Sequence, residues 1–66
     1  MDFGDAIILA ARGAHVTRPG IDGYIRAASI SDTVGSGFVR VDQFGVTHTW
    51  QCHGDDAVAI DWRVVQ

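Results

Sequence analysis

The chain has 66 residues, a net charge of −3 and 47% apolar residues, which is enough for one small domain. Its acidic balance argues against a general nucleic-acid binder, because such proteins neutralise phosphates with basic residues. No segment reaches the about 20 apolar residues of a membrane span, and Cys52 is the only cysteine, which excludes an internal disulfide.

The first predicted element is a helix over residues 2–12. Asp2 is a suitable N-cap, because its carboxylate can accept hydrogen bonds from the free N–H groups of the first turn. Gly13 is placed to end the helix in a left-handed conformation. Apolar side chains recur at helical spacing on one face: Phe3, Ala6, Ile7, Ala10 and Ala11. Ile8 and Leu9 widen this face, which fits a helix that contacts two neighbours.

Extended segments separated by turns follow the helix. In chain order they are predicted at residues 15–18, 24–30, 38–41, 46–51 and 62–65. Pro-Gly at 19–20 and Asp-Gly at 22–23 indicate turns, and residues 31–37 form a polar loop. Residues 43–45 close a hairpin, and residues 55–60 form a short helical turn that begins with two Asp.

Together these elements predict one α+β domain over residues 1–66, in which the N-terminal helix packs on a small, mostly antiparallel β-sheet. The core of so small a domain seldom contributes more than ~3–5 kcal/mol. We therefore expect an oligomer whose subunits bury part of the apolar surface. Asp2 and Asp5 stand where a signal peptide has basic residues, and a lone cysteine suits a reducing compartment, so we expect a cytoplasmic protein.

The sequence shows no pattern typical of a catalytic centre. Three serines lie in or near the polar loop, but no nucleophile motif or spaced base and orienting group accompanies them. These are Ser29, Ser31 and Ser36. We therefore expect a protein without enzymatic activity.

One loose group of metal-ligand residue types occurs late in the chain. It comprises His48, Cys52 and His53 with Asp55 or Asp56. A structural zinc site usually takes four ligands as two spaced pairs, whereas this is a single set. A loop histidine that hydrogen-bonds a partner or a ligand fits the pattern better. We expect no bound metal and no cofactor.

Residues 17–23 form a glycine-bracketed turn with Arg18 at its base. Gly20 and Gly23 can let backbone N–H groups approach an anion, and Arg18 can bind phosphate through two hydrogen bonds. The same pattern also occurs in turns that bind nothing. Every basic residue of the chain is Arg and every acidic one is Asp, a bias that a GC-rich genome also produces.

Four further side chains admit either a ligand-binding or a structural role. Trp50 and Trp62 can stack on a nucleobase, which contributes ~1–3 kcal/mol per base, or they can pack in the core or an interface. Asp56 and Asp61 can accept hydrogen bonds from ribose hydroxyls or a base N–H. They can equally cap a helix or pair with an Arg, and the residues alone leave these alternatives open.

Three stretches taken together resemble one protein family. Residues 1–7 (MDFGDAI) resemble its opening M-N-F-G-E-A-I, and residues 16–23 (VTRPGIDG) resemble its turn V-x-R-x-G-W-N-G. Residues 50–64 resemble its closing pattern, in which a Trp is followed six residues later by an Asp, then by Ala and Asp-Trp-x-V. The family is that of the phage Thoeris anti-defence sponges of the second described type.

The resemblance implies a small α+β homotetramer in the cytoplasm of an infected bacterial host. It implies sequestration, without cleavage, of the cyclic ADP-ribose isomers made by TIR-domain enzymes, and some members also hold cyclic dinucleotides. We expect no DNA, RNA or membrane partner. The ligand-binding residues that the matching positions suggest are Phe3, Arg18, Gly20, Asp22, Gly23, Trp50, Asp56 and Trp62. Of these, Phe3 and Trp62 are expected chiefly to support the fold and the assembly.

The sequence departs from the family at the turn. Ile21 stands where the family has Trp, and Asp22 stands where it has Asn. If that Trp stacks on a ligand base, this protein lacks the contact, and Asp22 adds a charge that disfavours a nearby phosphate. Residues 52–54 replace a Pro-Ser segment, and the middle of the chain is short at residues 31–37. The alternative hypothesis is a small phage protein-binding module that inhibits a host factor through an apolar surface.

Overall fold

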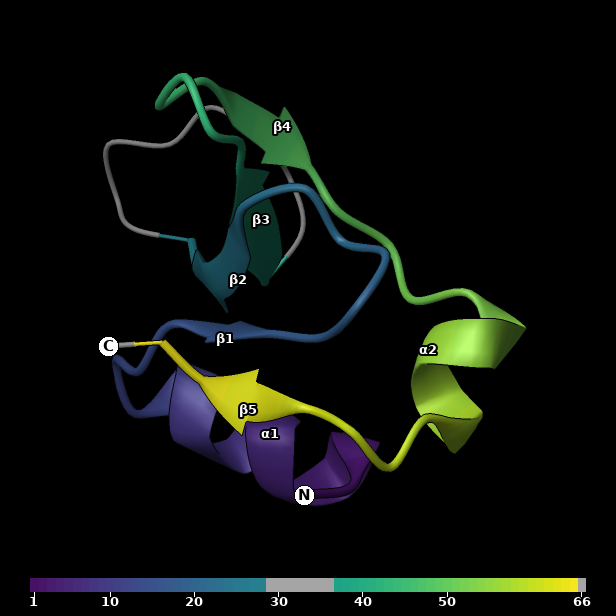
Figure 1. Ribbon diagram of the computed structural model, residues 1–66. Helices are drawn as coiled ribbons and strands as arrows, with labels where there is room; N and C mark the ends of the chain where they lie inside the picture. Colours follow the sequence, from purple (N-terminus) through teal and green to yellow (C-terminus); the bar gives the residue numbers. More distant parts are fainter. Residues whose placement is uncertain (29–36, 66) are drawn as a thin grey trace.

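The computed structural model describes residues 1–28 and 37–65 (Figure 1). It confirms the predicted α+β arrangement of an N-terminal helix with a small antiparallel sheet. In chain order the elements are α1 (Phe3–Ala11), β1 (Val16–Thr17), β2 (Tyr24–Ala27), β3 (Phe38–Val41), β4 (Thr47–Thr49), α2 (Gly54–Val58) and β5 (Arg63–Val64). Within these described residues, no helix is long and apolar enough to cross a membrane.

The strands form one sheet in the order β4-β3-β2-β1-β5, and the paired neighbours are antiparallel. β1 to β4 follow one another across the sheet, whereas β5 returns to pair with β1 at the far edge. The chain between β4 and β5 therefore travels from one edge of the sheet to the other, and α2 lies on this path (Figure 1). This crossing segment, residues 50–62, forms one wall of the pocket described below.

α1 begins at the predicted N-cap and buries a narrow face of small residues. The Asp2 carboxylate accepts a hydrogen bond of 2.9 Å from the backbone N–H three residues on, which satisfies one free donor of the first turn. Ala6 and Ala10 are fully buried, because their small side chains let the helix lie close on β1 and β2. Ala11 was predicted on the buried face but is exposed, and Ile8 is 52% exposed. The inward face is therefore narrower than predicted.

Three aromatic side chains close the core between α1 and the crossing segment. Trp62 is 2% exposed, and its ring centroid lies 5.6 Å from that of Phe3 and 6.3 Å from that of Trp50. Aromatic pairs in such tilted geometry contribute ~0.5–1.5 kcal/mol beyond the burial of their surface. The Trp62 indole N–H also donates to the backbone carbonyl of Asp56 at 3.0 Å. This cluster holds the crossing segment against α1.

Several strands are shorter than predicted. The segments at 15–18 and 62–65 pair over only two residues each. β4 ends at Thr49 because Trp50 leaves the sheet to pack on the aromatic cluster. The strand predicted at 24–30 is confirmed as far as Ala27. Its last two positions, and most of the predicted polar loop, fall at residues 29–36, which lie outside the described residues.

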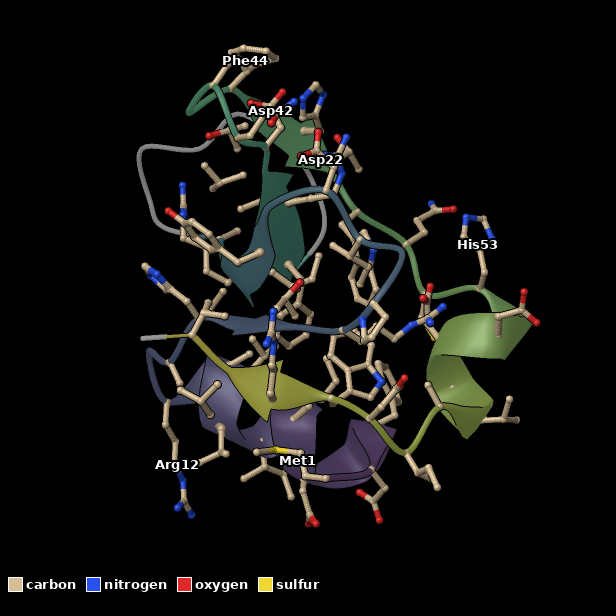
Figure 2. All side chains as sticks on the ribbon, viewed as in Figure 1. Met1, Arg12, Asp22, Asp42, Phe44 and His53 are labelled. Atoms are coloured by element: carbon tan, nitrogen blue, oxygen red, sulfur yellow. The ribbon has the colours of Figure 1, made fainter. Side chains whose placement is uncertain are left out.

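The second helix begins earlier than predicted and is shorter. Its N-cap is His53, and Asp56 lies in the first turn, where its carboxylate accepts a hydrogen bond of 3.0 Å from the His53 backbone N–H. This is one half of a capping box. Because α2 ends at Val58, Ile60 lies beyond the helix and is 80% exposed. His53 and Asp22 lie on the side of the molecule that carries α2 and the β3–β4 hairpin, whereas Arg12 lies at the opposite end (Figure 2).

Candidate ligand-binding pocket

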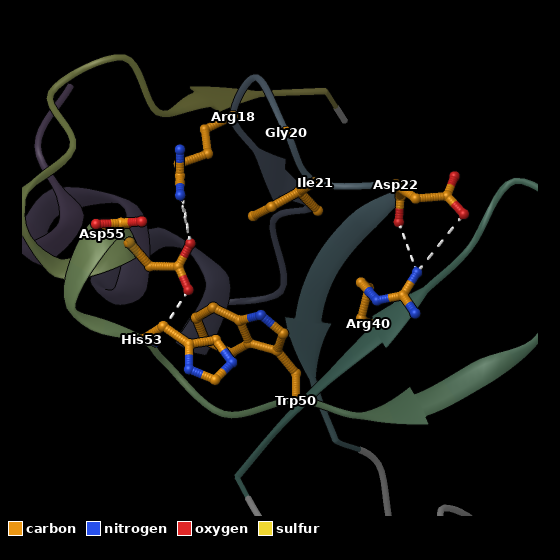
Figure 3. A pocket seen from close by; sticks show the side chains of 9 residues that line it. Arg18, Gly20, Ile21, Asp22, Arg40, Trp50, His53 and Asp55 are labelled. Atoms are coloured by element: carbon orange, nitrogen blue, oxygen red, sulfur yellow. Dashed lines mark hydrogen bonds and ion pairs between the residues drawn. The ribbon is translucent and has the colours of Figure 1, made fainter.

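An open pocket of about 500 Å³ lies between the β1–β2 turn, β3 and the crossing segment (Figure 3). Ligand-binding pockets of proteins typically measure roughly 300–1,000 Å³, so the space suits a nucleotide-sized molecule. The lining residues come from these three segments: Arg18, Gly20, Ile21, Asp22, Arg40, Trp50, His53, Asp55 and Asp56.

The β1–β2 turn is shaped by its Pro and Gly residues. The Ile21 N–H donates to the Arg18 carbonyl at 3.1 Å, and Gly20 has a φ of +96°. Pro followed by a residue of positive φ is typical of a type II turn. Gly23, with a φ of +87°, lies so close to β3 that an added Cβ would fall 1.8 Å from the Val41 carbonyl oxygen. Only glycine lets this turn approach β3.

Arg40 faces the pocket because of sheet register and incomplete helix cover. It pairs directly with Ile25 of β2, and directly opposed residues of antiparallel strands share a face. Ile25 is fully buried beneath α1. α1 packs on β1 and β2, however, and of the β3 residues on this face Phe38 packs against the core cluster whereas Arg40 lies beyond it. The Arg40 side chain therefore points into the open pocket (Figure 3).

The wall nearest α2 carries a tightly bonded ion pair between Arg18 and Asp56. The Arg18 Nε and one terminal nitrogen lie 3.0 and 2.8 Å from Asp56 Oδ1, and the other terminal nitrogen donates to the Pro19 carbonyl at 3.1 Å. The second Asp56 oxygen accepts from His53 N–H at 3.0 Å. The two side chains are only 19% and 8% exposed. The pair ties the β1–β2 turn to α2.

These contacts keep Asp56 in its charged form. Burial is the largest single influence and raises the pKa of the carboxyl. The hydrogen bonds from His53 N–H and Arg18, together with the Arg18 charge, outweigh burial and lower the pKa below the ordinary aspartate value. Hydrogen bonds to a carboxylate favour the ionised form in this way. Arg18 and Asp56 therefore neutralise each other at neutral pH.

The opposite wall carries a looser pair between Arg40 and Asp22 (Figure 3). One terminal nitrogen of Arg40 donates to the Asp22 backbone carbonyl at 2.9 Å and lies 3.8 Å from Asp22 Oδ2. The second distance is beyond that of a hydrogen bond. The side chains are 27% and 54% exposed. Within the described residues, Nε and the other terminal nitrogen of Arg40 have no hydrogen-bond partner.

Trp50 and His53 form an aromatic border between the two ion pairs. Trp50 is half-buried, with its ring 6.4 Å from Phe3, so part of the indole belongs to the core while part lines the pocket. Ile21 faces the same space from the β1–β2 turn (Figure 3). An aromatic face and an aliphatic side chain can enclose a planar base by stacking and apolar contact.

The pocket contains some of the residues suggested by the sequence and excludes others. The suggested residues that line it are Arg18, Gly20, Asp22, Trp50 and Asp56. Trp62 does not line it, because its indole is buried in the core, and Phe3 packs against both Trp rings without lining the pocket. Gly23 acts by its backbone approach to β3. Trp62, Phe3 and Gly23 therefore support the structure around the pocket without lining it.

Four lining residues are absent from the ligand-binding set that the sequence suggested: Ile21, Arg40, His53 and Asp55. A signal existed for Arg40, because it alternates with Val39 and Val41, which are both buried. Alternation places Arg40 on the face of the strand opposite to the two Val side chains. It does not indicate that this face borders a pocket whose opposite wall is formed by α2. His53 and Asp55 depend on where α2 begins.

The metal-ligand residue types do not assemble around a common point. Within residues 1–28 and 37–65, no group of three or more His, Cys, Asp and Glu side chains could hold a metal ion. His48 instead bonds Asp42 at 2.8 Å in the β3–β4 hairpin. Cys52 is exposed, and partial desolvation, followed by the nearby Asp56 charge, raises the pKa of its thiol. Ser29, Ser31 and Ser36 lie outside the described part of the chain.

No protein-family model matches this chain, and a search of curated proteins finds no match. The resemblance to the phage sponges therefore rests on the three sequence stretches alone. What the pocket can bind has to be inferred from the charges, hydrogen bonds and exposed surfaces of its own residues.

Proposed function

We propose that this protein binds and sequesters a cyclic nucleotide signal of the cyclic ADP-ribose type without cleaving it. The observation that carries the proposal is the convergence of Trp50 and Arg40, whose guanidinium is only partly engaged, on one open pocket of about 500 Å³. A dinucleotide-like ligand presents phosphates, ribose hydroxyls and a flat base. Arg suits the first of these and an indole the last.

The sequence resemblance supports the same proposal from an independent direction. Residues 16–23, which resemble the family's turn, and residues 50–64, which resemble its closing pattern, together contribute eight of the nine residues that line the pocket. In this proposal the protein acts in the cytoplasm of an infected bacterium. Ile21, which stands where the family has Trp, offers an aliphatic surface to the base, so we expect Trp50 to provide the main stacking contact.

We also propose that the chain assembles as a homo-oligomer, and as a tetramer by its resemblance. Large apolar side chains on the surface support assembly: Ile8 is 52%, Val58 77% and Ile60 80% exposed. Apolar area removed from water contributes roughly 25 cal/mol per Å², which would supplement a small core. Light scattering coupled to size-exclusion chromatography measures the mass directly, and a monomer at micromolar concentration would contradict this part of the proposal.

Thermal denaturation with and without ligands tests binding. A ligand present at 100 times its Kd adds about 2.7 kcal/mol, which raises the Tm of so small a domain by roughly 10–20 °C. The ligand panel is cyclic ADP-ribose and its isomers, linear ADP-ribose and cyclic dinucleotides. We expect a shift with at least one cyclic nucleotide, and no shift with any of them contradicts the proposal.

Recovery of the ligand separates sequestration from catalysis. The loaded protein is heated until it unfolds, and the released nucleotide is compared with the input by chromatography. A sponge returns the input molecule in stoichiometric amount. Release of linear ADP-ribose from a cyclic input would instead identify an enzyme.

A protein-binding module is the second candidate, and one observation favours it. Phe44 is 81% exposed in the turn between β3 and β4 and does not line the pocket. A module of this kind captures a host protein through that side chain and needs no nucleotide. Pull-down from host lysate with wild type, Phe44→Ser and Trp50→Ala distinguishes the two, because only Phe44→Ser is expected to lose a partner held by the hairpin.

A further inference from the structure

The two arginines of the pocket differ in what they have left to offer a ligand. All three nitrogens of Arg18 already contact Asp56 or the Pro19 carbonyl. A phosphate that approached Arg18 would compete with Asp56 for a guanidinium that is already neutralised, and would weaken contacts that hold the β1–β2 turn to α2. Arg18 is therefore a poor binding group, although the sequence drew attention to it first.

Arg40 has the opposite properties. Only one of its terminal nitrogens is engaged, and the Asp22 backbone carbonyl occupies it at 2.9 Å. The guanidinium is thus oriented, while two nitrogens have no hydrogen-bond partner within the described residues. A fork with two adjacent donors matches two phosphate oxygens. Arg40 can bind an anion without breaking any contact that holds the fold.

The Asp22 carboxylate lies beside the same guanidinium, near the terminal nitrogen that the Asp22 backbone carbonyl already engages, so it competes with an approaching anion for the Arg40 charge. It lies 3.8 Å from the same Arg40 nitrogen, too far for a hydrogen bond, and its side chain is 54% exposed. The contact between Arg40 and the turn does not depend on the Asp22 carboxylate, because the Asp22 backbone carbonyl makes the short hydrogen bond. The carboxylate can therefore swing away.

Charge in the pocket makes this displacement consequential. The lining carries two Arg and three Asp, so with His53 neutral its net charge is negative. Asp56 is neutralised by Arg18 at short range, which leaves Asp22 as the carboxylate nearest to Arg40; within residues 1–28 and 37–65, Asp55 has no arginine partner. Of the three carboxylates in the pocket, Asp22 is therefore the one whose movement away from Arg40 should raise the affinity for an anionic ligand most.

We propose that Arg40 is the residue that binds the phosphate of the ligand, and that the neighbouring Asp22 carboxylate competes with this phosphate for the Arg40 charge. This inference rests on the proposed function for the identity of the ligand, but it concerns any phosphate or pyrophosphate group. Asp22 then limits affinity, so that removal of its charge improves the site.

Calorimetric titration of wild type and single variants with inorganic pyrophosphate and with cyclic ADP-ribose tests the inference. Asp22→Asn keeps the backbone carbonyl and removes the competing charge, and we expect its Kd for pyrophosphate to fall about tenfold, the effect of removing one close charge interaction. Arg40→Gln should raise that Kd at least tenfold. Arg40→Lys keeps the charge without the planar fork, so its Kd for pyrophosphate should lie between those of wild type and Arg40→Gln.

Two control variants remove the same charge elsewhere. Asp55→Asn neutralises a carboxylate of the pocket that has no arginine partner, and Asp61→Asn neutralises an exposed one outside it. We expect less than a threefold change for the first and none for the second. Equal gains from Asp22→Asn and Asp55→Asn would overturn the inference, because they would show that only the general potential of the pocket matters.

The combined variant Asp22→Asn/Arg40→Gln provides the decisive comparison. If Asp22 acts by competing for Arg40, its removal brings no gain once Arg40 is absent, so the two effects are not additive. A full tenfold gain in the Arg40→Gln background would overturn the inference. Circular dichroism of each variant shows whether the fold is retained.

Failure of the inference and failure of the proposed function give different results. Cyclic ADP-ribose binding that is equal in wild type and folded Arg40→Gln overturns the inference and leaves the function standing. Pyrophosphate binding that responds to both residues, without binding of any cyclic nucleotide, supports the inference and contradicts the function. No pyrophosphate binding by wild type or Asp22→Asn overturns the inference.

Discussion

Two arginine–aspartate pairs face each other across one pocket, and they differ in almost every physical property. Arg18–Asp56 is mostly buried and makes short contacts through every nitrogen of its guanidinium. Arg40–Asp22 is more exposed and makes one short contact, to a backbone oxygen. The same two residue types thus form a stabilising ion pair on one wall and a weak, exchangeable contact on the other.

Burial and the number of engaged nitrogens, rather than residue type, therefore decide the role of each arginine. A buried guanidinium with all three nitrogens engaged contributes to the fold and has little to give a ligand. An oriented but incompletely bonded guanidinium keeps donors for one. Paired variants at corresponding positions of the two walls can therefore separate stability from binding.

Loss of Arg18 should have the largest effect. Arg18→Met leaves the Asp56 carboxylate, 8% exposed, without its counter-charge, and removal of one partner from a buried pair costs about 3–5 kcal/mol of unfolding free energy. Arg40→Met is the matched control and should cost less than about 1 kcal/mol, because its pair is more exposed. Urea unfolding followed by Trp fluorescence measures both, and equal losses would erase the distinction between the walls.

The glycine that holds the turn against β3 should have the next largest effect. Gly23→Ala places a Cβ 1.8 Å from the Val41 carbonyl oxygen at a φ of +87°, so strain and overpacking together should cost about 2–4 kcal/mol. Gly20→Ala is the control: its φ is also positive, at +96°, but nothing lies within 4 Å of an added Cβ. We expect the smaller loss there. The reverse order would show that the turn can move away from β3.

Local features of the fold could be predicted from the sequence because their causes lie within a few residues. Asp2 caps α1 through a backbone N–H three residues away, and Gly13 follows the helix with a φ of +104°. The Pro19-Gly20 turn is equally local. The strand from 38 to 41 is recognisable from alternation of buried and polar side chains.

The site was only partly predictable because its geometry depends on distant residues. Arg40 meets Asp22, eighteen positions away, through the register of β2 on β3 and the close approach at Gly23. Trp62 looks like a stacking surface in the sequence, yet the return of β5 beside β1 buries it. Which Trp remains in the pocket is decided by topology.

Acid should weaken the fold, and the Arg18–Asp56 wall should account for part of the loss. Because the pKa of Asp56 is lowered in the folded state, its contribution is complete above the ordinary aspartate pKa of about 3.9 and is lost as pH falls through the folded value. The pKa of Asp42 is also lowered, chiefly by the hydrogen bond with His48, and acts in the same direction.

Unfolding free energy should therefore be level between about pH 7 and 5 and decline below about pH 4. The decline should be shallower in Asp56→Asn and in Asp42→Asn than in wild type, since each variant removes one of the responsible groups. An Asp56→Asn curve parallel to that of wild type would contradict this prediction, because it would show that ionisation of Asp56 does not stabilise the folded state.

Removal of the Asp22 charge should have the smallest effect on the fold. Asp22→Asn keeps the 2.9 Å contact between Arg40 and the backbone carbonyl and loses only a carboxylate 3.8 Å away. Such an exposed pair contributes little, so the urea-derived unfolding free energy should stay within about 0.5 kcal/mol of wild type. A loss of unfolding free energy above about 1 kcal/mol would show that the Arg40–Asp22 pair also stabilises the fold. A side chain whose removal leaves the fold intact but changes pyrophosphate affinity belongs to the binding surface, and that combination is what distinguishes Asp22 from Asp56.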